Sequence, residues 1–171
     1  MRKFEKIIGV IFFLALLSSF LKINGSVLIL ILAGGIISMY YFYGGILIFN
    51  NVRAKDALNK DAFKGVSGLQ KALAVFSGFA LSTAVLGIMF KSLMWIGDTL
   101  MNSVALCSLL VLLIIVFLQY KKNKLAFYRF MLIRLAFYGS MTLVLFLIPW
   151  TTILEIKFSE HPEYIQVVKN S

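Results

Sequence analysis

The chain has 171 residues, of which 61% are hydrophobic, and it carries a formal net charge of +10 at pH 7. This composition argues against an ordinary water-soluble domain and indicates that the chain lies in lipid. The charge does not indicate nucleic-acid binding, because the cations flank apolar runs instead of alternating with exposed aromatic residues along a polar groove. The single cysteine, Cys107, allows no disulfide within the chain.

Five long apolar runs follow one another along the chain. Each has about the 17–25 residues that a helix needs to cross roughly 30 Å of hydrocarbon. The runs cover residues 4–21, 27–49, 69–90, 100–120 and 130–150. They predict an all-α integral membrane protein whose transmembrane domain, residues 1–150, has five helices. The first run also resembles the apolar part of a signal peptide, but the residues after it lack a small-residue cleavage site, and we therefore retain it as a span.

The segments between the runs are short, with one exception. Gly25 lies in a turn signal between the first two runs, which predicts an antiparallel helical hairpin. Residues 51–68 form the sizeable internal polar segment, and we expect them to form a short cytoplasmic helix against the headgroups. The tail, residues 151–171, is expected on the outer side. Its residues 154–158 alternate between apolar and charged, which is a strand signal.

The cations are divided unevenly between the two sides of the membrane that this arrangement implies. Four of them, Lys22, Lys91, Lys157 and Lys169, fall on one side. The others fall on the side of the N-terminus: Arg2, Lys3, Lys6, Arg53, Lys55, Lys60, Lys64, Lys71, Lys121, Lys122, Lys124, Arg129 and Arg134. Because the side with more Lys and Arg is normally cytoplasmic, we expect a multi-pass protein with its N-terminus inside and its C-terminus outside.

The two halves of the chain resemble each other. The segment 15–18, Ala-Leu-Leu-Ser, and Lys22 lie 69 residues before the segment 84–87, Ala-Val-Leu-Gly, and Lys91. In each half a span ends in an apolar residue followed by Lys, and a turn that contains glycine leads to the next span. Both hairpins enter from the same side. This predicts a parallel repeat of two tandem helical hairpins, with the fifth helix outside the repeat.

The end of the third run carries a further pattern. Residues 90–97 read Phe-Lys-Ser-Leu-Met-Trp-Ile-Gly. This segment resembles small membrane proteins of Bacteroidetes-type bacteria, in which a helix ends in Phe-Lys, a His-Trp-Pro-Gly-like turn follows and a second helix returns. The transmembrane hairpin of the gliding-motility and type 9 secretion motor subunit L is similar. The resemblance covers the length of a hairpin, and it implies a hairpin architecture in a bacterial inner membrane.

The chain departs from this pattern at positions that concern function. Met94 stands where His is common, and Ile96 stands where Pro is common. The motor family also carries a glutamate in its second helix, whereas the nearest positions here are Tyr40 and Leu112. Neither side chain can carry a titrating proton at physiological pH. The resemblance therefore implies the hairpin but not a proton-driven motor.

No group of residues in the sequence indicates catalysis or a bound metal. None of the seven Asp and Glu residues lies in the middle of a run, and Glu5 lies at the cytoplasmic edge of the first. Ion-coupled transporters usually need a carboxylate within the membrane, which disfavours such a transporter but leaves a pore of hydroxyl and backbone groups open. The only histidine, His161, lies in the tail. We therefore expect no catalytic, cofactor or metal site.

Small residues four apart mark the second and third runs. Gly34 and Ser38 have this spacing, as do Ala74, Gly78 and Ser82. Such residues let helix backbones approach closely. They predict that these two helices make the tightest helix contacts, within the chain or with a partner.

Arg134 is the deepest ionisable residue of the fifth run. We expect its long side chain to extend to the cytoplasmic surface, with contact to a lipid headgroup or a partner as the alternative. The basic residues grouped with it for such contacts are Lys121, Lys122, Lys124 and Arg129. The aromatic residues 40–43 are interpreted as interfacial anchors, with a groove for a lipid or peptide as the alternative.

These observations leave two leading hypotheses from different classes. The first is a non-catalytic accessory, assembly or scaffold subunit of a larger membrane complex, because the chain is small and has no chemical constellation. Its partners would be the lipid bilayer and other membrane protein subunits, without nucleic acid. The alternative is a small transporter or channel, acting alone or as a homo-oligomer. A membrane enzyme that acts on lipid is a third interpretation.

Overall fold

The computed structural model describes residues 2–57 and 59–170, and all regular secondary structure in them is helical. The five long helices are α1 (Arg2–Phe20), α2 (Ser26–Phe49), α3 (Gly68–Leu93), α4 (Asp98–Asn123) and α5 (Ala126–Leu147). Two short helices follow, α6 (Trp150–Lys157) and α7 (Pro162–Asn170). The predicted all-α class is confirmed.

Four of the long helices, α2 to α5, are long and apolar enough to cross a membrane. The expectation of a multi-pass membrane protein is confirmed to this extent. Five such helices were expected, and α1 falls short because four of its first five residues, 2–6, are charged. The long helices begin one to four residues before the predicted runs, because hydropathy marks the apolar part of a helix whereas the backbone continues into polar residues.

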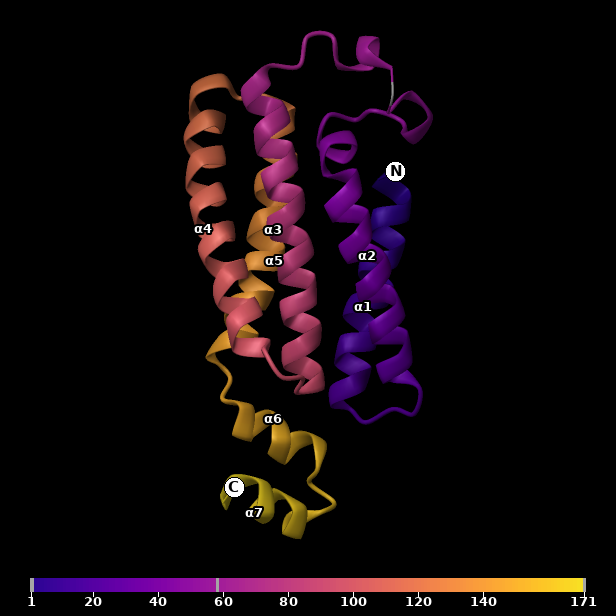
Figure 1. Cartoon of the computed structure of the whole chain (residues 1–171), viewed down its shortest axis with the longest axis vertical. Coiled ribbons are helices and arrows are strands. Elements are labelled where there is room, and N and C mark those ends of the chain that lie inside the picture. The colour runs from indigo at the N-terminus through magenta and orange to yellow at the C-terminus, as the bar shows by residue number, and fades with distance from the viewer. Residues whose placement is uncertain (1, 58, 171) are drawn as a thin grey trace.

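α3 lies at the centre of the bundle (Figure 1). It packs along α2, α4 and α5, and 67% of its most apolar stretch is buried, against 28–33% for the other three candidate spans. α1 packs mainly on α2. The outer helices therefore form two packed pairs, α1 with α2 and α4 with α5, and α1 and α5 are not closely packed against each other.

The two ends of the bundle carry different connections (Figure 1). The N-terminus, the α2–α3 connector and the α4–α5 turn lie at one end, here called the N-terminal end. The α1–α2 and α3–α4 turns lie at the opposite end, with α6 and α7 beyond them. The connector was expected to be a short helix, but its described part has only two 3-10 turns, Ala54–Asp56 and Lys60–Phe63. Gly65 has a φ of 83°, which a right-handed helix does not allow, so no helix continues from the connector into α3.

The tail is helical, and the predicted strand over residues 154–158 is wrong. α6 buries the neighbours Ile153 and Leu154 together, whereas a strand would point them to opposite faces. The described residues contain no other strand that could pair with this segment. α7 begins at Pro162, and proline is favoured at the first position of a helix.

The α1–α2 and α3–α4 turns have the same backbone path. Lys22 and Met94 both have a φ of 57°, and each is followed three residues later by a glycine, Gly25 or Gly97, with positive φ. The backbone hydrogen bonds of the two turns follow the same offset. Equivalent positions are therefore 72 residues apart, whereas residue identity indicated 69. The turn geometry sets this register, because each turn needs a glycine at the left-handed position before the second helix.

The closest contact between helices joins the backbones of α2 and α3. A Cβ added to Gly78 would lie 2.6 Å from the carbonyl oxygen of Tyr41 and 3.0 Å from the Cα of Gly45. A Cβ added to Gly45 would lie 2.9 Å from the carbonyl oxygen of Ala74. No larger residue fits at either glycine unless the two backbones move apart.

The remaining small residues singled out in the sequence lie further along the same contact. The hydroxyls of Ser38 and Ser82, both buried, are 2.8 Å apart. A Cβ on Gly34 would lie 3.0 Å from Met89 Sδ on α3 and 3.0 Å from the Phe12 ring on α1. The structure thus brings all five small residues to the places where α2 meets its neighbours.

Substitution of Gly78 should separate α2 from α3. We expect Gly78→Ala to lower the stability of the purified protein in detergent by about 1–3 kcal/mol, the usual cost of overpacking, measured as a lower midpoint of thermal unfolding. Gly35→Ala on α2 is the matched control, because a Cβ there meets no atom within 4 Å. Equal effects of the two substitutions would contradict the packing argument.

Candidate functional site

A buried ion pair joins the first and the last of the long helices. Nε and Nη2 of Arg134 on α5 donate to the two carboxylate oxygens of Glu5 on α1, the Nη2 bond being 2.6 Å long. Tyr41 Oη on α2 donates to Glu5 Oε1 at 2.8 Å. The side chains of Glu5 and Arg134 are only 8% and 15% exposed. This cluster ties α1, α2 and α5 together at one level of the bundle.

The guanidinium has further contacts. Nη1 of Arg134 donates to the carbonyl oxygen of Phe130 at 3.1 Å, and the guanidinium carbon lies 5.5 Å from the centre of the Phe49 ring. The Tyr138 ring packs edge-on against the ring of Tyr41, with centres 5.5 Å apart. Two parallel hydrogen bonds match the planar guanidinium to a carboxylate. The pair is therefore neutral as a unit and has a defined geometry.

The depth of this cluster follows from where the helices begin. Arg134 is eight residues beyond Ala126, the first residue of α5, which is roughly 12 Å along the axis at 1.5 Å per residue. Figure 1 shows that α1 begins further into the bundle than the α4–α5 turn. Glu5 therefore lies deeper than the edge position expected from the sequence. The sequence predicted that Arg134 extends to the cytoplasmic surface. In the structure its side chain instead binds the Glu5 carboxylate.

The periodicity of α1 is the signal that could have located Glu5. The buried residues of α1 are Glu5, Phe12, Ala15, Leu16 and Ser19. They recur at the three- and four-residue steps of one helix face. Lys3 and Lys6 on either side of Glu5 are exposed, so the sequence presents Glu5 as part of a charged flank although it belongs to the buried face.

A groove between α1 and α5 opens beside the ion pair. It has a volume of about 700 Å³, and Glu5 and Arg134 lie at its wall. The rest of the lining is mainly apolar and includes Val10, Phe13 and Phe137. A second hollow of about 270 Å³ lies between the same two helices, closer to the opposite end. The space between α1 and α5 is therefore a mainly apolar groove with a neutral ion pair at one end.

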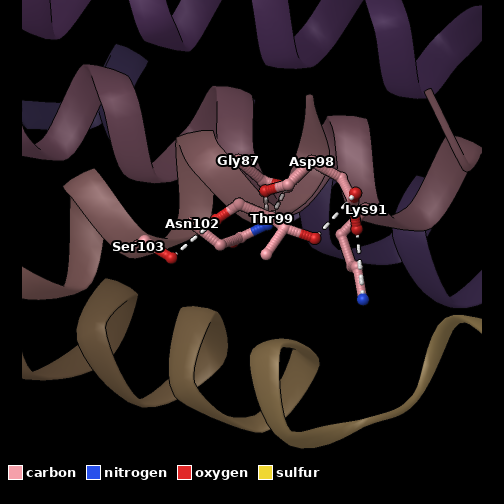
Figure 2. Close-up of polar contacts among 6 residues, drawn as sticks. All are labelled: Gly87, Lys91, Asp98, Thr99, Asn102 and Ser103. Carbon is pink, nitrogen blue, oxygen red and sulfur yellow. Dashed lines mark hydrogen bonds and ion pairs between the residues drawn. The ribbon is translucent and has the colours of Figure 1, made fainter. Parts of the chain in front are cut away.

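A second polar cluster, shown in Figure 2, lies at the α3–α4 hairpin. Nδ2 of the fully buried Asn102 donates to the carbonyl oxygens of Gly87 at 3.0 Å and Asp98 at 2.8 Å. Nζ of Lys91 lies 3.1 Å from the Asp98 carboxylate. A Cβ on Gly87 would lie 2.9 Å from Oδ1 of Asn102, so a larger residue there would displace the Asn102 amide. These contacts hold the two helices of the hairpin close together.

The five cations that the sequence grouped as headgroup or partner contacts do not lie together. Arg134 belongs to the buried pair. The other four are exposed at the N-terminal end of the bundle: Lys121, Lys122, Lys124 and Arg129. Contact of these four with headgroups or a partner stays a prediction.

Comparison with known proteins gives no assignment for this site. No protein family, curated protein or solved structure matches the chain. The resemblance to the type 9 secretion motor subunit stays a prediction for this reason. Within the described residues, no three or more His, Cys, Asp and Glu side chains gather where they could hold a metal ion. The function must therefore be inferred from the groove and the ion pair.

Removal of either partner of the ion pair should destabilise the protein, and removal of both should cost less than the sum of the two single losses. Glu5→Gln leaves Arg134 buried without a counter-charge, and loss of one partner of a buried pair costs about 3–5 kcal/mol. We expect Glu5→Gln and Arg134→Gln each to lower the thermal unfolding midpoint in detergent, and the double variant to lose less than the sum of the two. Additive losses in this double-mutant cycle would show that the two side chains are not coupled.

Proposed function

We propose that the protein is a non-catalytic, polytopic membrane protein that serves as an accessory, assembly or scaffold subunit of a larger membrane complex. The groove between α1 and α5 is the observation that carries this proposal. It is mainly apolar, and it runs along two long helices that are not closely packed against each other. A helix of another subunit fits such a groove.

The ion pair beside the groove favours a protein occupant over lipid. Acyl chains fill apolar space, but they offer no hydrogen-bond acceptor to a charged group, and a charge in contact with hydrocarbon is costly. A helix of another subunit would fill the same space and bring backbone and side-chain acceptors to the exposed edge of Arg134.

We further propose that α1 is a fifth span, with the N-terminus inside the cell and the C-terminus outside. α1 packs along α2, and the neutralisation of Glu5 by Arg134 removes part of the cost that the charged first turn of α1 imposes on insertion. The excess of Lys and Arg at the N-terminal end supports the orientation. The resemblance to proteins of Bacteroidetes-type bacteria supports a bacterial inner membrane.

A small transporter or channel is the alternative function, and two observations weigh against it. The carboxylates of Glu5 and Asp98 are each paired with a cation, so neither is a free group for a transported proton or sodium ion. The backbones of α2 and α3 approach too closely for a pore between them. A channel would therefore need a path elsewhere in the bundle or between copies of the chain.

Reporter fusions test the topology. A reporter after Ser171 and one within residues 54–64 should locate to opposite sides of the membrane, because α3, α4 and α5 lie between them. A reporter at the N-terminus should locate to the same side as the one within residues 54–64, because α1 and α2 lie between them. An N-terminal reporter on the other side would show that α1 does not cross.

Photo-cross-linking tests the proposed partner. Val10 lines the groove, whereas Ile114 on α4 does not, and the two side chains are equally exposed at 57% and 58%. A photoreactive amino acid at Val10 should join the protein to a distinct membrane protein in its native membrane, with a yield several-fold above that at Ile114.

Equal yields at the two positions would contradict the proposed docking groove. A product that contains two copies of this chain, together with ion flux through vesicles that hold only this protein, would favour the channel.

A further inference from the structure

A pocket lies between the opposite end of the bundle and the two short helices α6 and α7, which lie beyond that end in Figure 1. Its volume is about 700 Å³, which is within the range of small-molecule sites. Its walls come from the α1–α2 turn, the α3–α4 turn, α6 and α7. It shares no lining residue with the groove between α1 and α5.

The lining of the pocket is positively charged. Three lysines, Lys22, Lys91 and Lys157, line it together with one carboxylate, Asp98. Lys91 is paired with Asp98 at 3.1 Å. Nζ of Lys22 lies 3.3 Å from the carboxylate of Glu160, whose side chain is 77% exposed. Lys22 and Lys91 thus have counter-charges, and the third lysine supplies the excess.

Lys157 is half-buried, and its Nζ lies 5.6 Å from the centre of the Phe20 ring. In the part of the chain that the structure describes, no carboxylate forms an ion pair with it. Burial lowers the pKa of Lys157, as expected for an ammonium group removed from water without a partner. A bound anion would supply the missing counter-charge.

Two other features of the lining indicate the kind of anion. Ser19 is 4% exposed, and its hydroxyl has no hydrogen-bond partner among the described residues. Trp95 and Trp150, the two tryptophans of the chain, also line the pocket. Tryptophan is enriched at the depth of lipid headgroups. The pocket therefore combines cations, an unpartnered hydroxyl and interfacial aromatic rings.

We propose that this pocket binds a phosphate-bearing anion, of the kind that an anionic lipid headgroup carries, with Lys157 as its principal counter-charge. Lysine binds phosphate as a point charge and needs no fixed orientation, which suits three lysines that reach the pocket from different elements. Lys22 and Lys91 also line the pocket, each beside its own carboxylate. This proposal does not rest on the proposed function, because a helix of another subunit could fill the groove whether or not this pocket holds an anion.

Tryptophan fluorescence tests the site directly, because both tryptophans line it. The purified full-length protein in a zwitterionic detergent is titrated with inorganic phosphate in one arm and with phosphatidylglycerol in the other. Phosphatidylcholine is the control lipid without net charge. We expect a saturable change with phosphatidylglycerol and none with phosphatidylcholine. A saturable change with inorganic phosphate alone would support the site and identify a soluble anion as its ligand.

Variants of Lys157 decide whether the binding belongs to this pocket. Lys157→Gln should weaken the affinity about fivefold, the effect of one lysine beside an anionic headgroup, whereas Lys157→Arg should retain it. Lys55→Gln removes the same charge from the exposed connector at the N-terminal end of the bundle without changing the lining, and it should leave the affinity unchanged.

Three results would overturn the proposal. The first is equal affinity of Lys157→Gln and the native protein, and the second is no binding in either arm. The third is a lower unfolding midpoint of Lys157→Gln in the absence of ligand, combined with failure of Lys157→Arg to retain binding, because Lys157 would then have a structural role only.

Discussion

The backbone contact between α2 and α3 determines where every other helix lies. Inside a bilayer the hydrophobic effect does not bring helices together, so they associate through close packing and interhelical hydrogen bonds. Gly45 and Gly78 provide the close packing, and the hydroxyls of Ser38 and Ser82 provide the hydrogen bond. With α2 held along α3, α1 is placed on α2, and the remaining faces of α3 receive α4 and α5.

Charge is treated differently at the two ends of this bundle. At the level of Glu5, the carboxylate and the guanidinium of Arg134 satisfy each other and leave only a narrow exposed edge. At the opposite end, Lys157 has no such partner among the described residues. The closed pair joins helices that are not otherwise closely packed, so it contributes to architecture. Lys157 lies over the Phe20 ring of α1 but has no carboxylate partner among the described residues, and this is why it indicates a ligand.

Much of the fold could be predicted from the sequence, because a chain in lipid must satisfy its backbone within helices and hydropathy then marks the spans. Which faces meet could not be predicted in the same way. The sequence analysis looked for small residues four positions apart and therefore missed Gly45. Gly45 lies on the same helix face as Ser38, but it is seven residues away, which is one step of three and one of four. Tyr41 was grouped with interfacial aromatics, yet it is buried while Tyr43 is 77% exposed. The pocket under α6 depends on how the tail folds back, which no local pattern specifies.

The two partners of the Glu5–Arg134 pair are 129 residues apart in the chain. The ribosome therefore adds Glu5 to the chain 129 residues before it adds Arg134. During synthesis the Glu5 carboxylate therefore lacks its Arg134 counter-charge until α5 has been made. An incomplete chain without α5 therefore differs chemically from the complete one, because its Glu5 carboxylate is unpaired, whereas in the complete structure this carboxylate is buried and paired.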